Sequence, residues 1–409
     1  MDIKEHFRRI VEEEDRNNNF LHLTVNEPVM SKTARTFMGS QLSDRYFMGG
    51  GDEEGVVDYG PGTFLGFPSI QALIDDATKK LCNRLNASSA NLNCLSGIHA
   101  MMCAILSTTE PGDTVMHVDL KHGGHFCTKG ILERTGRHPI PSHYDYKNLT
   151  FDAKKIGESF HKHNAKAFYM DVSVYLNPHN LKEIREAIGK DAIIIYDASH
   201  TLGLIMGGKF QMPFKEGADV ISANTHKTLP GPQKGLVAFA NKKIGDKAGA
   251  IINGGLYSSP HLTSLIALST TILEMDKYGA GYAEQVIKNS NSLGFELESL
   301  GYQVRKTKLG RFSENHQVHL FTGDLEHYRD FYRKLVKNNI AVNFDNSLGG
   351  KMFVRLGTQG ITRLGMREAE MRKIANFIDS AMKGMNVSNQ VMDFVNSHKN
   401  IHYSFDAII

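Results

Sequence analysis

Segments rich in β-branched residues alternate with amphipathic helical segments from about residue 90 to residue 255 of this 409-residue chain. Strand patterns are expected at 167–172, 192–196, 219–222 and 235–240. A helix beginning at Asn180 separates the first two and places Leu181, Ile184 and Ile188 on one face. Strands that alternate with helices are typical of a mostly parallel sheet covered by helices on both faces. The sequence therefore predicts an α/β fold.

The chain is long for a single domain, and its pattern changes beyond residue 285. Helical periodicity runs from His261 to Tyr278 and again through Leu300, and it leads into a second set of elements. Strands are expected there at 317–321, 340–344 and 352–356, and helices at 326–337 and 368–385. We expect an N-terminal arm (1–30), a large domain (31–285) and a small C-terminal α+β domain (286–409).

Composition excludes several classes of protein. The net charge is +3 and no basic run is long enough to follow a phosphate backbone, so nucleic acid is not an expected partner. The charged segment Met1–Phe20 lacks the apolar core of a signal peptide, and no stretch has the length of a membrane span, which favours a cytoplasmic protein. The cysteines show no C-x-x-C spacing and are expected to be free thiols. They are Cys82, Cys94, Cys103 and Cys127.

A carboxylate and an amine follow two neighbouring predicted strands. The apolar run Ile193–Tyr196 ends in Asp197, at the edge of the sheet where α/β proteins bind ligands, and a carboxylate there can pair with a protonated ring nitrogen. Further on, the polar segment Asn224–Thr228 places Lys227 on a predicted loop at the same edge. A lysine in a partly dry site can form an imine. We interpret Lys227 as a Schiff-base lysine.

Two segments are candidate phosphate-binding sites. Ser96 and Gly97 open a predicted helix, so that backbone N–H groups would face an anion. Ser258 and Ser259, followed by Pro260, are expected to cap the next helix, and simple capping is the alternative there.

Two histidines three residues apart flank a pair of glycines. His122 and His125, with Asp119 nearby, offer too few ligands for a metal site, and no metal is expected. An imidazole stacked on a cofactor ring is the favoured interpretation. Arg355, on a predicted strand, suits a bidentate grip on a substrate carboxylate, with a surface ion pair as the alternative.

Together these motifs resemble serine hydroxymethyltransferase and its relatives, a branch of the fold type I pyridoxal-phosphate enzymes, over residues 22–375. The segments that carry the resemblance are Lys121–His125, Asp197–Ile205 and Thr225–Pro232. The resemblance implies a mostly parallel sheet of the seven-stranded type and pyridoxal 5′-phosphate as cofactor.

The resemblance also assigns roles. Lys227 would form the Schiff base, Asp197 would pair with the pyridine nitrogen, and His122 would stack on the ring. The expected catalytic residues are His122, His200, Thr225 and Lys227. The cofactor-binding residues would be Ser96, Gly97, His122, Ser173, Asp197, His200, His226 and Lys227.

Residues of a neighbouring subunit would complete each site. Tyr46, Ser258 and Ser259 match positions that the family contributes across a homodimer, so we expect a dimer with shared sites, or a tetramer. Arg355, Asn26 and Tyr46 would bind the amino-acid substrate.

Several departures from the family bear on folate. Phe47-Met48-Gly49 stands where the family has Ala-Glu-Gly, so its glutamate is missing unless an insertion lets Glu53 or Glu54 replace it. Further departures are Phe64-Leu65, Pro230, Gln233-Lys234 and a shorter segment between Asn343 and Arg355. Together they argue against tetrahydrofolate as acceptor.

The sequence therefore predicts cleavage of a β-hydroxy amino acid to a glycyl carbanion, which is then transferred to another aldehyde, as in threonine transaldolases. The alternatives are a folate-dependent serine or α-methylserine hydroxymethyltransferase, and a catalytically inactive pyridoxal-phosphate-binding protein. The expected small-molecule partners are an amino acid and an aldehyde.

Overall fold

The structure is a computed structural model that describes residues 2–323, 325–346, 348 and 352–406. Its described residues form two compact units. One unit comprises those of 28–284 with 348 and 403–406, and the other comprises those of 2–27, 285–346 and 352–402. No helix among the described residues combines the length and apolar character needed to cross a membrane.

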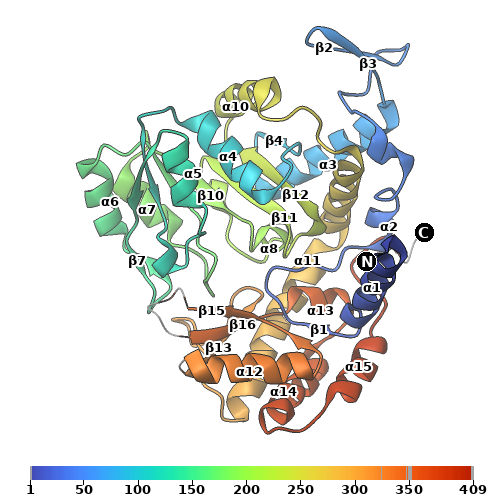
Figure 1. The fold of residues 1–409 in the computed structure, drawn as a ribbon. Helices are drawn as coiled ribbons and strands as arrows, with labels where there is room; N and C mark the ends of the chain where they lie inside the picture. The colour runs from blue at the N-terminus through green and yellow to red at the C-terminus, as the bar shows by residue number, and fades with distance from the viewer. Residues whose placement is uncertain (1, 324, 347, 349–351, 407–409) are drawn as a thin grey trace. The chain divides into compact units, whose positions relative to one another are not determined.

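The first unit is built on a seven-stranded sheet in the order β4-β12-β11-β10-β9-β5-β6 (Figure 1). The strands are β4 (Ser89–Asn91), β5 (Thr114–His117), β6 (His138–Pro141), β9 (Ala167–Met170), β10 (Ile193–Asp197), β11 (Val220–His226) and β12 (Pro230–Phe239). Strand β12 is antiparallel to both of its neighbours, and the other pairs are parallel. The predicted mostly parallel sheet of seven strands is confirmed.

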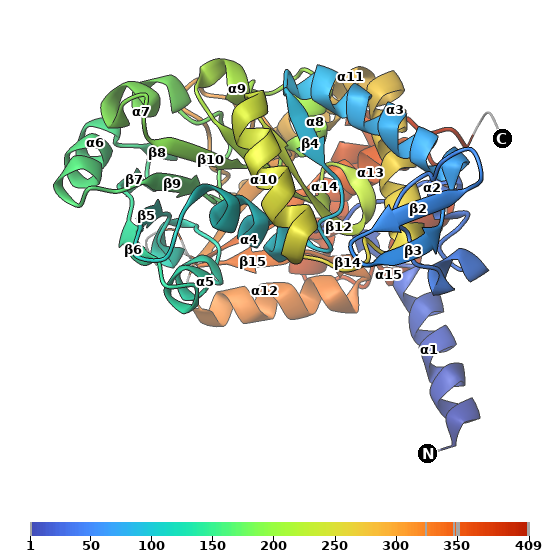
Figure 2. The same cartoon turned by 90° about the horizontal axis from the view of Figure 1, so that it is seen from above.

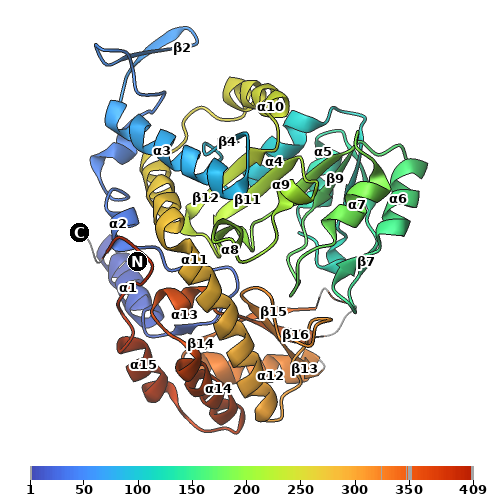
Figure 3. The same cartoon turned by 180° about the vertical axis from the view of Figure 1, so that it is seen from behind.

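Helices cover both faces of this sheet. They are α3 (Pro68–Leu85), α4 (Gly97–Thr108), α5 (Thr128–Arg134), α6 (Ala153–Lys162), α7 (Leu181–Ile188), α8 (Leu202–Met206), α9 (Pro213–Glu216) and α10 (Lys242–Gly255). Helices α4, α5 and α10 lie on one face, and α3, α6, α7 and α9 lie on the other (Figures 1 and 3). Seen from above, α4 and α10 lie side by side (Figure 2). Small apolar residues of α4, such as Ala100 and Ala104, pack in one buried cluster with Val220 and Val237 of the sheet.

Short elements complete the unit. They are α2 (Lys32–Arg35), the 3-10 helices η1 (Gln41–Asp44) and η2 (Leu120–His122), and the hairpins β2 (Val56–Tyr59) with β3 (Gly62–Leu65) and β7 (Tyr144–Asp145) with β8 (Thr150–Phe151).

The predicted loop around Lys227 proves to be a hairpin. Strand β11 continues through His226 instead of ending at Ser222, and β12 begins at Pro230 instead of Gly235. The polar residues that suggested a loop pair across this hairpin, with Asn224 opposite Gly235. Sheet pairing satisfies their backbone groups without water, which is why polarity misled the prediction.

The next helix begins later than predicted. Ser258, Ser259 and Pro260 precede α11 (Leu262–Ser299) and do not cap it, because His261 adopts a left-handed φ of 55° between them and the helix. The two helical stretches predicted there form this one continuous helix of 38 residues.

The second unit contains two small sheets. β13 (Gln317–Gly323), β16 (Met352–Gly357) and β15 (Asn343–Asp345) form a three-stranded antiparallel sheet, and β1 (Leu21–His22) pairs in parallel with β14 (Ile340–Ala341). The predicted strand 340–344 is therefore two strands in different sheets. The remaining helices are α1 (Ile3–Asn17), α12 (Leu325–Lys337), α13 (Gln359–Arg363), α14 (Glu368–Met382) and α15 (Ser388–Asn396). The small α+β unit is confirmed.

Candidate active site

Asp197 occupies the carboxyl end of the central strand β10, and two donors fix its carboxylate. The hydroxyl of Tyr169 donates to Oδ2 at 2.7 Å, and the backbone N–H of Ser199 donates to Oδ1 at 2.8 Å. Complete burial raises the pKa of Tyr169 well above its usual value, so this hydroxyl remains a proton donor at any physiological pH. The hydroxyl also lies 3.0 Å from Oγ of Ser222. The carboxylate is thereby held in one orientation, with lone pairs left for a further donor.

Lys227 lies in the turn between β11 and β12, next to the strand that carries Asp197. Its Nζ is 3.1 Å from Nε2 of His200. His200 follows β10 by three residues and is buried. Two adjacent strands thus place an amine, an imidazole and a carboxylate at one edge of the sheet, as the sequence predicts for a parallel arrangement.

The two residues before Lys227 have different surroundings. Thr225 is fully buried, and its hydroxyl donates to the carbonyl of Pro232 at 2.6 Å and accepts from the N–H of Lys234 at 3.1 Å. Both hydrogen bonds of this hydroxyl lie within the hairpin, and the catalytic role expected for Thr225 stays a prediction. His226 is partly buried, and burial together with the charge of Lys227 lowers its pKa to about 4, which keeps the imidazole neutral.

The N-terminus of α4 faces the same strands. Ser96 is the N-cap, accepting from the N–H of His99 at 3.1 Å, and Gly97 is the first helical residue. A Cβ on Gly97 would lie 2.7 Å from Cβ of Asn224, so only glycine lets the helix start this close to β11. The amide oxygen of Asn224 is buried and has no hydrogen-bond partner among the described residues. A polar atom in this position calls for a donor from outside the chain.

His125, rather than His122, belongs to this cluster. The charges of Asp197 and Lys227 both act on His125, while burial lowers its pKa. Its backbone N–H donates to Asp171 at 3.2 Å, and its ring stacks on Phe126 with centroids 4.7 Å apart. The sequence offered both histidines, and the structure brings together the second with Asp197 and Lys227.

His122 lies at the end of η2, with its ring stacked on Tyr146 at a centroid distance of 6.4 Å. Burial lowers its pKa, and the charged groups that act on it are Lys121, Asp119 and His143. None of these belongs to the Asp197–Lys227 cluster.

Ser173 is connected to the glycines of the same segment. Its N–H donates to the carbonyl of Gly123 at 2.7 Å, and Gly124 pairs with Val172. A Cβ on Gly124 would meet the carbonyl oxygen of Val118 at 2.1 Å, which explains the need for glycine at this crossing.

The residues expected to act across a dimer are accessible. Tyr46 is 57% exposed, and its ring stacks on Phe64. Ser258 is exposed, and Ser259 is partly buried, in the loop between α10 and α11.

Two predicted substrate-binding residues belong to the second unit. Arg355, on β16, is partly buried, with 13% of its side chain exposed, and forms an ion pair with Asp345 at 3.4 Å. Burial lowers its pKa and Asp345 opposes that effect. Asn26 is exposed in a turn after β1.

The sequence argument missed Tyr169 and Asp171, which support the site from within β9 and its end. Asp171 accepts from the N–H groups of Val118 and His125 and from the hydroxyl of Thr128. Burial raises its pKa to about 7. The sequence signal that could have identified Tyr169 and Asp171 was the presence of these two polar side chains in the otherwise apolar segment Ala167–Val172.

Comparisons with known proteins identify the family of this chain and agree with its fold. The family model for serine hydroxymethyltransferase matches residues 2–378. The chain is 34% identical over 404 residues to a fluorothreonine transaldolase of Streptantibioticus cattleyicolor, covering 97% of this chain but 63% of that protein. It is also 34% identical over 426 residues to a serine hydroxymethyltransferase of Methanobrevibacter smithii, covering 98% and 95% of the two chains. The crystal structure of an L-threonine transaldolase from Pseudomonas fluorescens superposes with a TM-score of 0.90 at 27% identity, covering 100% of this chain and 94% of that one.

The fold is that of a fold type I pyridoxal-phosphate enzyme. The chain belongs to the serine hydroxymethyltransferase family, and it is a pyridoxal-phosphate-dependent enzyme. The resemblance inferred from the motifs is confirmed.

The residues present fit this cofactor. A carboxylate for the pyridine nitrogen, a lysine amine and a helix N-terminus for the phosphate converge on one sheet edge.

Proposed function

We propose that this enzyme is a folate-independent threonine transaldolase. It would cleave the Cα–Cβ bond of a β-hydroxy amino acid, release the first aldehyde and join the glycyl unit to a second aldehyde. The new β-hydroxy amino acid contains every atom of the glycyl unit and of the second aldehyde, so the reaction needs no oxidant, reductant or one-carbon carrier.

The observation that carries the proposal is the apolar character of the segment where the family has its glutamate. Phe47 is 7% exposed and packs against Phe67, and Met48 lines a cavity. Glu53 and Glu54 lie in an exposed turn before β2, in which Asp52 accepts from the N–H of Glu54 at 3.0 Å. A carboxylate that handles the serine hydroxyl and assists folate chemistry is therefore missing from this position. The similarity to two proteins named as transaldolases also supports the proposed reaction.

Bound pyridoxal phosphate supplies an electron sink for the electron pair left on Cα. Asp197, oriented by Tyr169, would keep the pyridine nitrogen protonated. Lys227 would hold the cofactor, and His200 at 3.1 Å from Nζ is placed to take or return a proton. We propose His125 for the stacking role predicted for His122, because it is the histidine near both Asp197 and Lys227.

Ser96 and Gly97 would bind the phosphate through the N-terminus of α4. Ser173 and His226 would flank the cofactor, and Arg355 with Asn26 would bind the substrate carboxylate. We further propose a cytoplasmic homodimer in which Tyr46 and Ser258–Ser259 serve the partner's site.

The test supplies threonine and an aromatic aldehyde without folate. Acetaldehyde release, followed by reduction with a coupled dehydrogenase, should match formation of the aryl β-hydroxy amino acid measured by mass spectrometry. Lys227→Ala should lose the cofactor's visible absorption and both products. Lys242→Ala, at a side chain 81% exposed, is the matched control and should retain them.

The competing function is that of the Methanobrevibacter relative, at the same identity. Turnover of serine that requires tetrahydrofolate, together with no reaction of threonine, would establish the hydroxymethyltransferase instead. A colourless wild-type protein that takes up no pyridoxal phosphate would contradict both.

A further inference from the structure

Cys94, His99 and Cys103 form a compact cluster outside the residues assigned to the cofactor. The two sulfurs and a ring nitrogen of His99 all lie within 4.8 Å of one another. Cys94 belongs to the loop between β4 and α4, and the other two residues lie one helical turn apart on α4. Neither thiol forms a disulfide, and both are fully buried in the hydrophobic cluster that α4 forms with the sheet.

Hydrogen bonds to the backbone set the tautomer of His99. The N–H of Leu95 donates to Nδ1 at 2.9 Å, so Nδ1 carries the lone pair. Nε2 therefore carries the proton, and it donates to the carbonyl of Leu256 at 2.9 Å. A metal-binding histidine is oriented in this way, with one nitrogen free of a proton and the other donating to a carbonyl. An ion at Nδ1 would take the place of the Leu95 N–H.

Charge also suits a divalent ion. Lys234 is 1% exposed, donates to the carbonyl of Pro260 at 2.7 Å and acts electrostatically on Cys94. Two thiolates alongside a divalent ion make a neutral unit, so binding would place no net charge beside Lys234.

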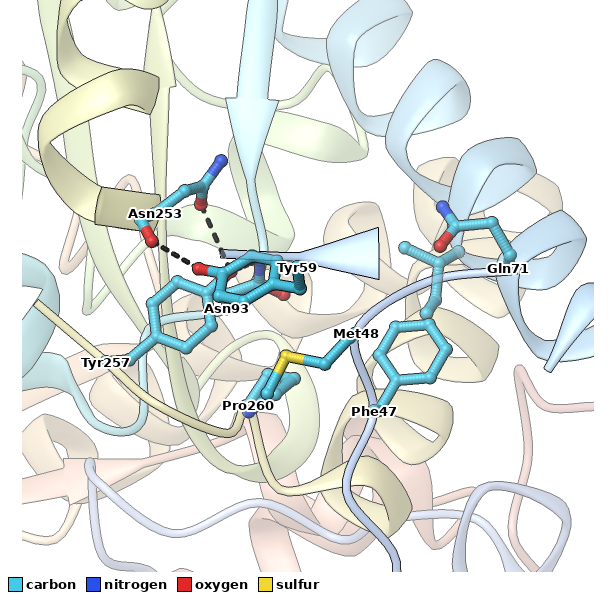
Figure 4. A pocket seen from close by; sticks show the side chains of 9 residues that line it. Phe47, Met48, Tyr59, Gln71, Asn93, Asn253, Tyr257 and Pro260 are labelled. Carbon is cyan, nitrogen blue, oxygen red and sulfur yellow. Dashed lines mark hydrogen bonds between the residues drawn. The ribbon is translucent and has the colours of Figure 1, made fainter. Parts of the chain in front are cut away.

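A cavity of about 220 Å³ is lined by residues that neighbour the cluster in the chain (Figure 4). Asn93, which precedes Cys94, and Tyr257, which follows Leu256, line it and are joined by a hydrogen bond of 2.7 Å. Pro260, the acceptor of Lys234, lines it as well. The cavity is thus lined by the chain neighbours of Cys94 and of the carbonyl group that orients His99.

We propose that Cys94, Cys103 and His99 bind one zinc ion with a solvent molecule as fourth ligand. Two thiolates and an imidazole select zinc among the common divalent ions. The atoms bound to tetrahedral zinc lie roughly 3.5 to 3.8 Å from one another. The three ligand atoms lie within 4.8 Å of one another, so side-chain rotations that move them by about 1 Å would bring them to zinc-binding distances. Binding releases one proton from each thiol. The ion would tie the loop at Cys94 to α4 itself.

The experiment uses the full-length holoenzyme, purified under reducing conditions and freed of metal with a chelator. Added Zn²⁺ should bind at one equivalent per chain, measured by competition with a chromophoric chelator and by elemental analysis. Co²⁺ in its place should give thiolate-to-cobalt charge-transfer absorption. The melting temperature of the wild type should rise with Zn²⁺ concentration, a result that depends on no variant.

Matched cysteine variants locate the site. Cys94→Ser and Cys103→Ser should each lose the bound equivalent and the cobalt absorption. Cys82→Ser and Cys127→Ser, at the two partly buried thiols, should retain both.

Three outcomes would overturn the proposal. They are an unchanged wild-type melting temperature with no stoichiometric Zn²⁺, equal loss of binding in Cys82→Ser, and a Cys94–Cys103 disulfide formed in place of metal binding. These readouts do not depend on turnover, so the zinc site and the proposed transaldolase activity stand or fall separately.

Discussion

Replacing Gly97 by alanine tests the link between close packing and cofactor binding. The new Cβ would lie 2.7 Å from Cβ and 3.5 Å from Cα of Asn224, and carbon atoms at the shorter distance cannot both stay in place. Asn224 is held by pairing with Gly235 in the β11–β12 hairpin. The strain is therefore expected to move the start of α4, including the N–H groups that face the proposed phosphate site.

The magnitude follows from two opposing effects. Overpacking by one methyl group costs about 1 to 3 kcal/mol. Alanine is a better helix former than glycine by up to about 1 kcal/mol, which offsets part of that cost. We expect a net loss of about 1 to 2 kcal/mol in the free energy of unfolding. If the same strain opposes phosphate binding, the affinity for pyridoxal phosphate falls about 5- to 30-fold.

Urea denaturation and titration of the apoprotein with pyridoxal phosphate measure the two quantities. Gly249→Ala is the control, because this glycine lies within α10 and a Cβ there meets nothing within 4 Å. That variant should gain up to about 1 kcal/mol with unchanged cofactor affinity. Wild-type stability and affinity in Gly97→Ala would refute the argument.

Two further predictions concern buried groups. Tyr169→Phe removes the hydroxyl that donates to Asp197 at 2.7 Å. Loss of a hydrogen bond to a charged group costs about 1.5 to 3 kcal/mol, so the affinity for pyridoxal phosphate should fall at least tenfold. Wild-type affinity in this variant would exclude a role for the hydrogen bond. Burial lowers the pKa of His179 from 6.5 to about 3. Below pH 6.5 the unfolded chain therefore binds a proton that the native chain does not. The free energy of unfolding should then decrease by about 1.4 kcal/mol for each unit by which the pH is lowered. His179→Phe should flatten this acid dependence in denaturant titrations at several pH values, and an unchanged slope would assign it to other groups.

Local sequence patterns identified four strands of the seven-stranded sheet and the residue at the end of the central one, whereas β4, β5 and β6 were not predicted from the pattern. A strand buried on both faces must be apolar throughout, so the run Ile193–Tyr196 identified β10 and placed Asp197 at its end. The periodicity of Leu181–Ile188 likewise identified α7. These features depend on neighbours in the chain, and sequence records them directly.

Features that depend on pairing between distant segments required the tertiary structure. Lys227 was recognisable from its motif, but its place in an antiparallel hairpin depends on β11 pairing with β12. His122 and His125 are equivalent as a pattern, and the folded chain distinguishes them because the charges of Asp197 and Lys227 act on His125 and not on His122.

The cluster of Cys94, His99 and Cys103 likewise has one part that local sequence shows and one part that only the fold shows. The spacing of His99 and Cys103 by one helical turn was visible in the sequence. The closeness of Cys94 to His99 and Cys103 was not visible there, because it depends on the path of the loop between β4 and α4. Sequence determined which chemical groups this protein carries and which strand ends present them. Tertiary packing decided which groups meet, because contacts between distant segments are fixed by the folded core and not by local periodicity.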